Sequence, residues 1–100
     1  MFIIIWEFTV KPDQINVFEQ AYGPQGEWAA LFKQYPGFIK TELLKDAIVS
    51  GRYLTCDYWE TEQDYQAFKN AQNGDYIILD KGFESLTMNE KFVGNFLGSP

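Results

Sequence analysis

The chain has 100 residues, the size of one domain, and 18% of them are aromatic. This is more aromatic surface than so small a core needs, so we expect some of it to line a pocket or an interface, although a Phe-rich core would also use it. The net charge of −6 argues against nucleic acid and against an anionic membrane as partners, because both need clustered Lys and Arg.

The cysteine content and the first residues of the chain predict a cytoplasmic protein. Cys56 is the only cysteine, so no intramolecular disulfide forms and nothing requires an oxidising compartment. The N-terminal apolar run has no basic segment before it and is too short for a signal peptide or a membrane span.

The first half of the chain is typical of a strand followed by a broken helix. Phe2–Val10 is rich in β-branched and aromatic residues and is apolar on both faces, which indicates a strand covered on both sides. Asp13 is expected to cap the helix that follows. Pro24 interrupts that helix, and a second helical piece with one apolar stripe is expected over residues 25–35.

A hairpin and a second helical region follow. Residues 38–45 alternate as a strand, with Phe38, Lys40, Glu42 and Leu44 on one face, and residues 46–51 connect them to a third strand over 52–60.

Thr61 and Asp64 resemble a capping box that begins the second helix. Asn73-Gly74 is expected to break this helix. A further helical stretch covers residues 76–86, and the last strand covers residues 88–97.

This order of elements predicts one α+β domain over residues 1–100, with a ferredoxin-like β-α-β-β-α-β arrangement. Its antiparallel sheet carries helices on one face only. Because the strands are apolar on both sides, the other face must also be buried. We therefore expect a homodimer formed through that sheet face.

The residue inventory excludes several chemistries. The chain has no histidine, which removes Ser-His and Cys-His catalysis, proximal-His haem ligation and histidine metal sites. A single cysteine cannot hold an iron–sulfur cluster. A carboxylate site for magnesium or calcium is not excluded, but no ligand spacing supports one, and no Gly-rich nucleotide-binding loop is present.

The third predicted strand carries the strongest candidate site. Tyr53, Thr55, Asp57 and Trp59 project from one face by the strand period of two, and Tyr65 can fold back over that face. If this face meets the helices, it forms an aromatic pocket with a few polar groups. Alternatively, Trp59 and Tyr65 only fill the core. A buried Asp57 would need a partner or a raised pKa, whereas a slip in register would expose it.

Several stretches together resemble the antibiotic biosynthesis monooxygenase family, a group within the dimeric α+β barrel superfamily. They are Phe8–Pro12, Tyr35–Phe38, Thr41–Leu44 and Tyr58–Thr61, followed by Tyr65 and Phe68. The resemblance implies a homodimer with a pocket between sheet and helices. It also implies oxygenation of a small aromatic molecule without metal, flavin or haem, through an electron-rich substrate anion that reacts with dioxygen. The haem-degrading branch of the superfamily is rejected, because it needs a histidine.

The resemblance assigns roles to individual residues. The family's active-site tryptophan corresponds to Trp59, and its tyrosine six positions later corresponds to Tyr65. Thr55 stands where the characterised enzymes have asparagine. We expect Trp59, Tyr65 and Asp57 to be catalytic and Tyr53, Thr55, Trp28 and Phe32 to contact the substrate.

These observations lead to two main hypotheses. The first is a cofactor-free monooxygenase acting on a small aromatic or polyketide-like compound, with Asp57 or Tyr53 as base. The second is a non-catalytic dimeric barrel that binds a small ligand, which Thr55 favours. An isomerase or lyase on the same fold is a third alternative, because fold does not determine function.

Overall fold

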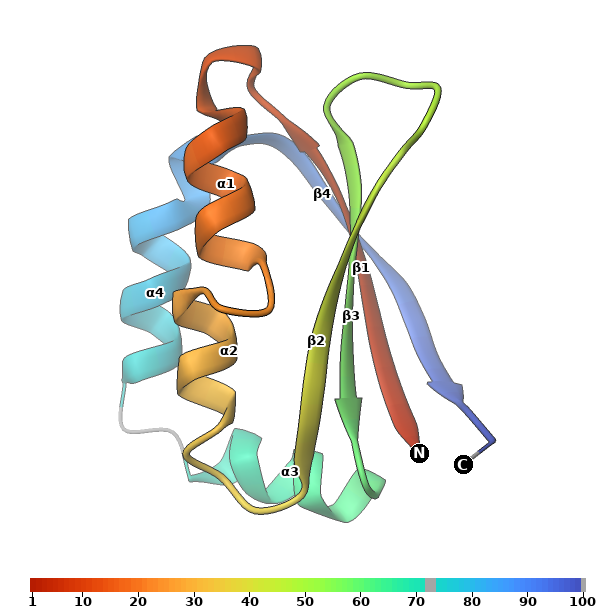
Figure 1. Ribbon diagram of the computed structural model, residues 1–100. Coiled ribbons are helices and arrows are strands. Elements are labelled where there is room, and N and C mark those ends of the chain that lie inside the picture. Colours follow the sequence, from red (N-terminus) through yellow and green to blue (C-terminus); the bar gives the residue numbers. More distant parts are fainter. Residues whose placement is uncertain (72–73, 100) are drawn as a thin grey trace.

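The computed structural model describes residues 1–71 and 74–99, which form a four-stranded antiparallel sheet with helices on one face (Figure 1). In chain order, the elements are β1 (Phe2–Val10), the 3-10 turn η1 (Pro12–Gln14), α1 (Ile15–Tyr22), α2 (Glu27–Phe32), β2 (Phe38–Lys45), β3 (Arg52–Trp59), α3 (Glu62–Asn70), α4 (Asp75–Phe83), the 3-10 turn η2 (Glu84–Leu86) and β4 (Thr87–Leu97). The strand order is β2-β3-β1-β4. The predicted α+β, ferredoxin-like fold is confirmed.

The central strand β1 is apolar on both faces, as its sequence predicts. Phe2, Ile4 and Phe8 are buried beneath the helices. Ile3 and Ile5 point to the other face, where they are half-buried. We call that face the bare face, because Figure 1 shows the helices gathered on the opposite side of the sheet.

The corner between α1 and α2 sets the shape of the helical layer. The predicted break is confirmed, since α1 ends at Tyr22 and α2 begins at Glu27. At Gly26, an added Cβ would lie 2.3 Å from the carbonyl oxygens of Gln20 and Ala21, so this corner has no room for a side chain.

Aromatic contacts join this helical layer to the sheet. On α1, Phe18 and Tyr22 stack with ring centroids 4.3 Å apart, and Tyr22 contacts Phe8 of β1 at 5.1 Å. On α2, Phe32 contacts Trp59 of β3 at 6.0 Å. These contacts fix the two helices over the face of the sheet that carries the predicted site.

Two local predictions are wrong. Asp13 does not cap a helix, because Pro12 starts a 3-10 turn and α1 begins only after Gln14, which makes no side-chain cap bond. The predicted strand faces of residues 38–45 also fail at Phe38. An irregularity between Phe38 and Lys40 adds one residue to β2, so Phe38 lies opposite Trp59 and packs into the core.

The second helical region agrees better with the prediction. Thr61 is the N-cap of α3, and its hydroxyl oxygen accepts a hydrogen bond from the Asp64 backbone N–H at 3.1 Å. Asn73 lies outside the described residues, while Gly74, with φ of 91°, precedes α4. Within the described residues, no helix combines the length and the apolar character needed to cross a membrane.

Candidate functional site

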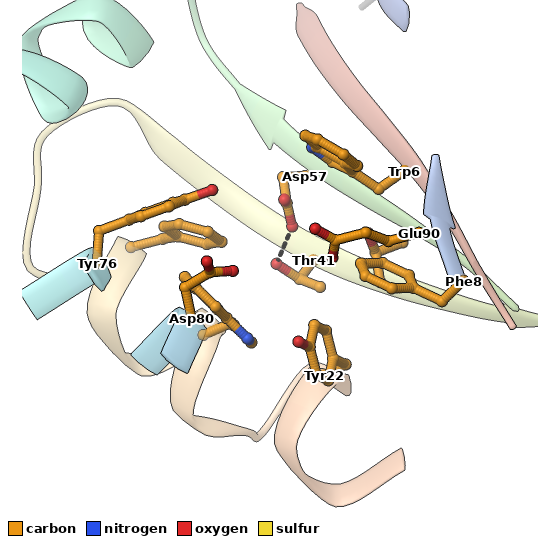
Figure 2. A pocket seen from close by; sticks show the side chains of 11 residues that line it. Trp6, Phe8, Tyr22, Thr41, Asp57, Tyr76, Asp80 and Glu90 are labelled. Carbon is orange, nitrogen blue, oxygen red and sulfur yellow. Dashed lines mark hydrogen bonds between the residues drawn. The ribbon is translucent and has the colours of Figure 1, made fainter. Parts of the chain in front are cut away.

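A cavity lies between the sheet and the helical layer, on the side opposite the bare face (Figure 2). It holds about 520 Å³ of space free of atoms, and part of this space is open solvent. Six aromatic, three acidic and two threonine side chains line it: Trp6, Phe8, Tyr22, Trp28, Phe32, Tyr76, Asp57, Asp80, Glu90, Thr41 and Thr55. This composition fits a small organic molecule with a ring and a few polar groups.

Asp57 is the acidic group that β3 presents to this cavity. Its carboxylate accepts a hydrogen bond of 2.7 Å from the hydroxyl of Thr41 on the neighbouring strand β2. Burial raises the pKa of Asp57 to about 6, although the Thr41 hydrogen bond acts in the opposite direction. The expectation that a buried Asp57 needs a partner or a raised pKa is confirmed, and both are present. Asp57 therefore exchanges a proton close to neutral pH.

Asp80 and Glu90 bring two further carboxyl groups to the cavity from α4 and β4. Figure 2 shows both side chains together with Asp57 around the same space. Burial raises the pKa of Glu90, and the negative charges of Asp80 and Glu84 add to this rise. All eight Lys and Arg residues belong to the described part of the chain, and none of them lines the cavity. The cavity is therefore acidic.

Hydrogen-bond donors also face this space. The indole Nε1 of Trp28 is buried and makes no hydrogen bond of good geometry with the described residues, but its N–H lies close enough to the Tyr22 hydroxyl to oppose the rise of the Tyr22 pKa. Burial raises the pKa of Tyr22 and of Tyr76 to about 12, so both phenols stay protonated at neutral pH. They can donate hydrogen bonds but cannot act as bases, whereas Asp57, whose pKa burial raises to about 6, can accept a proton near neutral pH.

Comparison with known proteins places this chain in a family. A model of the family described as "Antibiotic biosynthesis monooxygenase" matches residues 1–73. The chain belongs to the antibiotic biosynthesis monooxygenase family. The resemblance inferred from the sequence is thereby confirmed. A search among curated proteins finds no match.

Solved structures of antibiotic biosynthesis monooxygenases share the fold. SnoaB from Streptomyces nogalater, described as a cofactor-independent oxygenase, is 20% identical, with 99% of this chain and 93% of SnoaB aligned and a TM-score of 0.70. A Nitrosomonas europaea protein named for the same family is 20% identical, with 98% of each chain aligned and a TM-score of 0.69. One from Deinococcus radiodurans is 14% identical, with 100% and 94% aligned and a TM-score of 0.75. At these identities, the likeness extends to the fold alone.

The residues at the family's tryptophan and tyrosine positions lie behind the cavity wall. Trp59 is fully buried, and its ring centroid lies 6.0 Å from that of Phe32 and 5.8 Å from that of Tyr65. Its indole Nε1 has no hydrogen-bond partner among the described residues. Burial raises the pKa of Tyr65, with a further contribution from the charge of Asp57. Neither Trp59 nor Tyr65 lines the cavity, so their catalytic roles stay a prediction.

Three of the four predicted substrate-contact residues lie together in the cavity wall: Trp28, Phe32 and Thr55. Tyr53 does not. It is 1% exposed, and its hydroxyl donates a hydrogen bond to the carboxylate of Glu19 on α1. Burial, together with Glu19, raises the pKa of Tyr53 to about 12, which favours Asp57 over Tyr53 as the base.

Sequence reasoning missed the lining residues from α4 and β4. Tyr76 and Asp80 stand four residues apart, so the helical period places them on one side of α4. This spacing was a usable signal. Glu90 lies opposite Phe8 in the β4–β1 pairing, and that register cannot be read from the β4 sequence alone.

The described residues offer no evident metal site, since residues 1–71 and 74–99 contain no group of three acidic or cysteine side chains arranged to hold an ion. Cys56 is buried on the opposite face of β3 from Asp57. Burial raises its pKa, with Glu42 and Asp57 adding to the rise, so this thiol is a poor nucleophile.

Proposed function

We propose that the protein is a cofactor-independent monooxygenase that oxidises a small aromatic or polyketide-like compound with dioxygen. The observation that carries this proposal is Asp57, a carboxyl group with a pKa of about 6 inside an aromatic cavity. Family membership supports it, as does the fold shared with SnoaB, which is described as a cofactor-independent oxygenase.

Asp57 acts as the general base in this proposal. Its ionised carboxylate removes a proton from an activated CH₂ group of the substrate, leaving a ring-stabilised carbanion. The carbanion gives its electrons to dioxygen and a C–O bond forms. Asp57 returns the proton to give a hydroperoxide, which loses water as the O–O bond breaks and a C=O bond forms. One oxygen atom enters the product and the other leaves as water.

Other cavity residues stabilise and orient the anion. The N–H of Trp28, which lies beside the Tyr22 hydroxyl, supplies a donor for an enolate or phenolate oxygen, and such a donor is more effective in a dry cavity than in water. Trp28 and Phe32 offer ring faces against which an aromatic substrate stacks. We propose that Trp59 and Tyr65 act on the substrate through the packing of Phe32 and the surroundings of Asp57.

Oxygen consumption tests the proposal directly. The purified protein is mixed with anthrones, hydroquinones and naphthols, and uptake of O₂ is compared between wild type, Asp57→Asn and Asp75→Asn. Asp75 lies in the first turn of α4 and does not line the cavity, so its variant controls for the loss of one carboxylate. We expect turnover that Asp57→Asn abolishes and Asp75→Asn retains. Absence of turnover across the panel contradicts the proposal.

A second function is favoured by Thr55, which lines the cavity where the characterised enzymes have asparagine. The protein would then bind a small ligand without transforming it. A thermal-shift screen separates the two functions. A ligand at about a hundred times its dissociation constant stabilises the folded protein by roughly 2.7 kcal/mol, and such a ligand recovered unchanged supports the binding role.

We also propose that residues 1–100 act as one domain that forms a homodimer through the bare face. β4 pairs with β1 and contributes Glu90 to the cavity, so the segment beyond the matched residues 1–73 completes both the sheet and the site. Leu44 and Phe96 are 47% and 45% exposed on the bare face, which supports burial against a second copy. A cytoplasmic location is proposed from the free thiol of Cys56.

A further inference from the structure

We propose that Thr41 is a positioning residue for the base: its hydroxyl holds the Asp57 carboxyl group in the cavity and stabilises the ionised form. The catalytic consequence rests on the proposed function, whereas the contact between the two side chains is a feature of the fold. Three features support this role: a direct hydrogen bond, the register of β2 against β3, and the surroundings of Asp57.

The contact between the two side chains is direct and shielded from water. The Thr41 hydroxyl donates a hydrogen bond of 2.7 Å to Oδ1 of Asp57, and Figure 2 shows this bond within the cavity. A hydrogen bond to an ionised carboxylate is about twice as strong as one between neutral groups. Thr41 is only 4% exposed, so water does not readily take the place of its hydroxyl. Oδ2 of Asp57 accepts no hydrogen bond from the described residues, so it is the oxygen left for a substrate proton.

The irregularity in β2 brings Thr41 to this position. Ile39 is the extra residue of β2, and it lies directly before Lys40. Without it, regular pairing would set Lys40 opposite Asp57, where an ammonium group would hold the pKa of the carboxyl group low. With it, Thr41 is the partner of Asp57, and Lys40 lies over the Tyr58 ring on the bare face. The base therefore receives a neutral donor in place of a cation, as expected of a bulge that re-aims a side chain beside a functional site.

The other titratable groups near Asp57 do not replace this donor. They come from several elements: Tyr22 of α1, Tyr65 of α3, Tyr76 and Asp80 of α4, and Glu90 of β4. The pKa values of the three tyrosines are raised, so these phenols stay neutral while Asp57 titrates. Asp80 and Glu90 are acidic and cannot stabilise a second negative charge. Burial raises the pKa of Asp57 and the Thr41 hydrogen bond lowers it, so Thr41 is the side chain that opposes the effect of burial.

The pKa of Asp57 in the folded protein tests this role without substrate or oxygen. Carbon-13 NMR follows the side-chain carboxyl signals across pH, and the signal of Asp57 is the one that Asp57→Asn removes. Thr41→Val keeps nearly the same shape but removes the donor, so we expect the pKa of Asp57 to rise by about one pH unit. Thr41→Ser keeps the hydroxyl and should retain the wild-type pKa. Thr9→Val removes a hydroxyl on the bare face of β1 and should also leave it unchanged.

Oxygen uptake provides a second, independent readout. In Thr41→Val the midpoint of the kcat/KM pH profile should move upward with the pKa of Asp57, which lowers kcat/KM near pH 6 by about fivefold, and Thr41→Ser should retain the wild-type profile. Circular dichroism checks folding, and Thr41→Ala is used if Thr41→Val does not fold.

Three results would overturn the role of Thr41: a pKa of Asp57 that stays the same or falls when the hydroxyl is removed, a serine variant that behaves like the valine variant, or turnover with a pH profile that does not move. If no substrate is turned over while the pKa of Asp57 rises as expected, only the proposed reaction fails, and the stabilisation of ionised Asp57 by Thr41 is supported.

Discussion

At the residue scale, Asp57 determines the pH dependence of the proposed reaction. The ionised carboxylate is the active form, and burial raises its pKa to about 6. We therefore expect kcat/KM to rise with pH, to reach half its maximum near that value, and then to level off. Asp57→Asn should lower kcat/KM by about 10²–10⁴-fold, the usual contribution of a general base. Initial rates across pH provide the measurement, and an unchanged pH profile in the variant would assign the base to another group.

The raised pKa of Asp57 also affects the stability of the folded protein. The pKa of Asp57 is about 6 in the folded protein and about 3.9 when unfolded, so the folded state binds this proton more tightly. The contribution of Asp57 to the free energy of unfolding is complete below about pH 4 and is lost as the pH rises through about 6. With Asp57 ionised, the folded protein is less stable than with Asp57 protonated by roughly 3 kcal/mol at most.

Asp57→Asn should therefore stabilise the protein at neutral pH, and the gain should shrink as the pH falls toward about 4. The amide oxygen of the new side chain can still accept the hydrogen bond from Thr41. Urea denaturation of wild type and variant at neutral and acidic pH measures the difference. A variant that is less stable than wild type at neutral pH would show that the carboxylate is not destabilised by burial.

The residue scale also shows how far a sequence predicts a site. Asp57 and Thr55 were predictable, because strand alternation and the buried face of β3 are both visible in the sequence. The spacing of Tyr76 and Asp80 was a usable signal for one side of α4, but the approach of Asp80 and Glu90 to one cavity was not predictable, because it depends on how α4 and β4 are placed against β1. Trp59 matches the family's position in sequence, yet its side chain contacts Phe32 from behind the cavity wall.

At the element scale, the tight corner between α1 and α2 determines how the two helices lie over the sheet. Alanine substitutions at two glycines, one in this corner and one outside it, test whether the corner has room for a side chain. Gly26→Ala should destabilise the fold by about 1–3 kcal/mol, because the new methyl group would lie 2.3 Å from two backbone carbonyl oxygens. Gly82→Ala, in α4 with nothing within 4 Å, should stabilise it by about 0.5–1 kcal/mol through helix propensity. Thermal unfolding compares them, and shifts in the same direction would contradict the steric argument.

Most helices and strands were predictable from the sequence, because the patterns that indicate them involve residues close together in the chain. The alternation of β3, the break before α2 and the Thr61 cap all depend on neighbouring residues. The failures have non-local or competing causes. The irregularity at Phe38 depends on pairing with Trp59. Asp13 does not cap a helix because it lies inside a 3-10 turn that begins at Pro12.

At the scale of the whole molecule, the two faces of the sheet have different roles. The face beneath the helices encloses the cavity, whereas the bare face presents apolar groups on both edge strands. Leu44 lies on β2 opposite Leu54, and Phe96 lies on β4 opposite Ile3. A homodimer through this face would bury both edges at once and leave each cavity to its own subunit.

Charge placed on the bare face tests this arrangement. Wild type should sediment as a dimer at micromolar concentration, and Leu44→Asp/Phe96→Asp should sediment as a monomer, because two carboxylates per subunit would be withdrawn from water in the interface. Ile77→Asp/Ile78→Asp adds the same charge at apolar positions of α4 that are 59% and 69% exposed, and it should remain dimeric. Analytical ultracentrifugation with circular dichroism distinguishes dissociation from unfolding. A monomeric wild type, or a helix variant that dissociates while the sheet variant does not, would place the interface elsewhere.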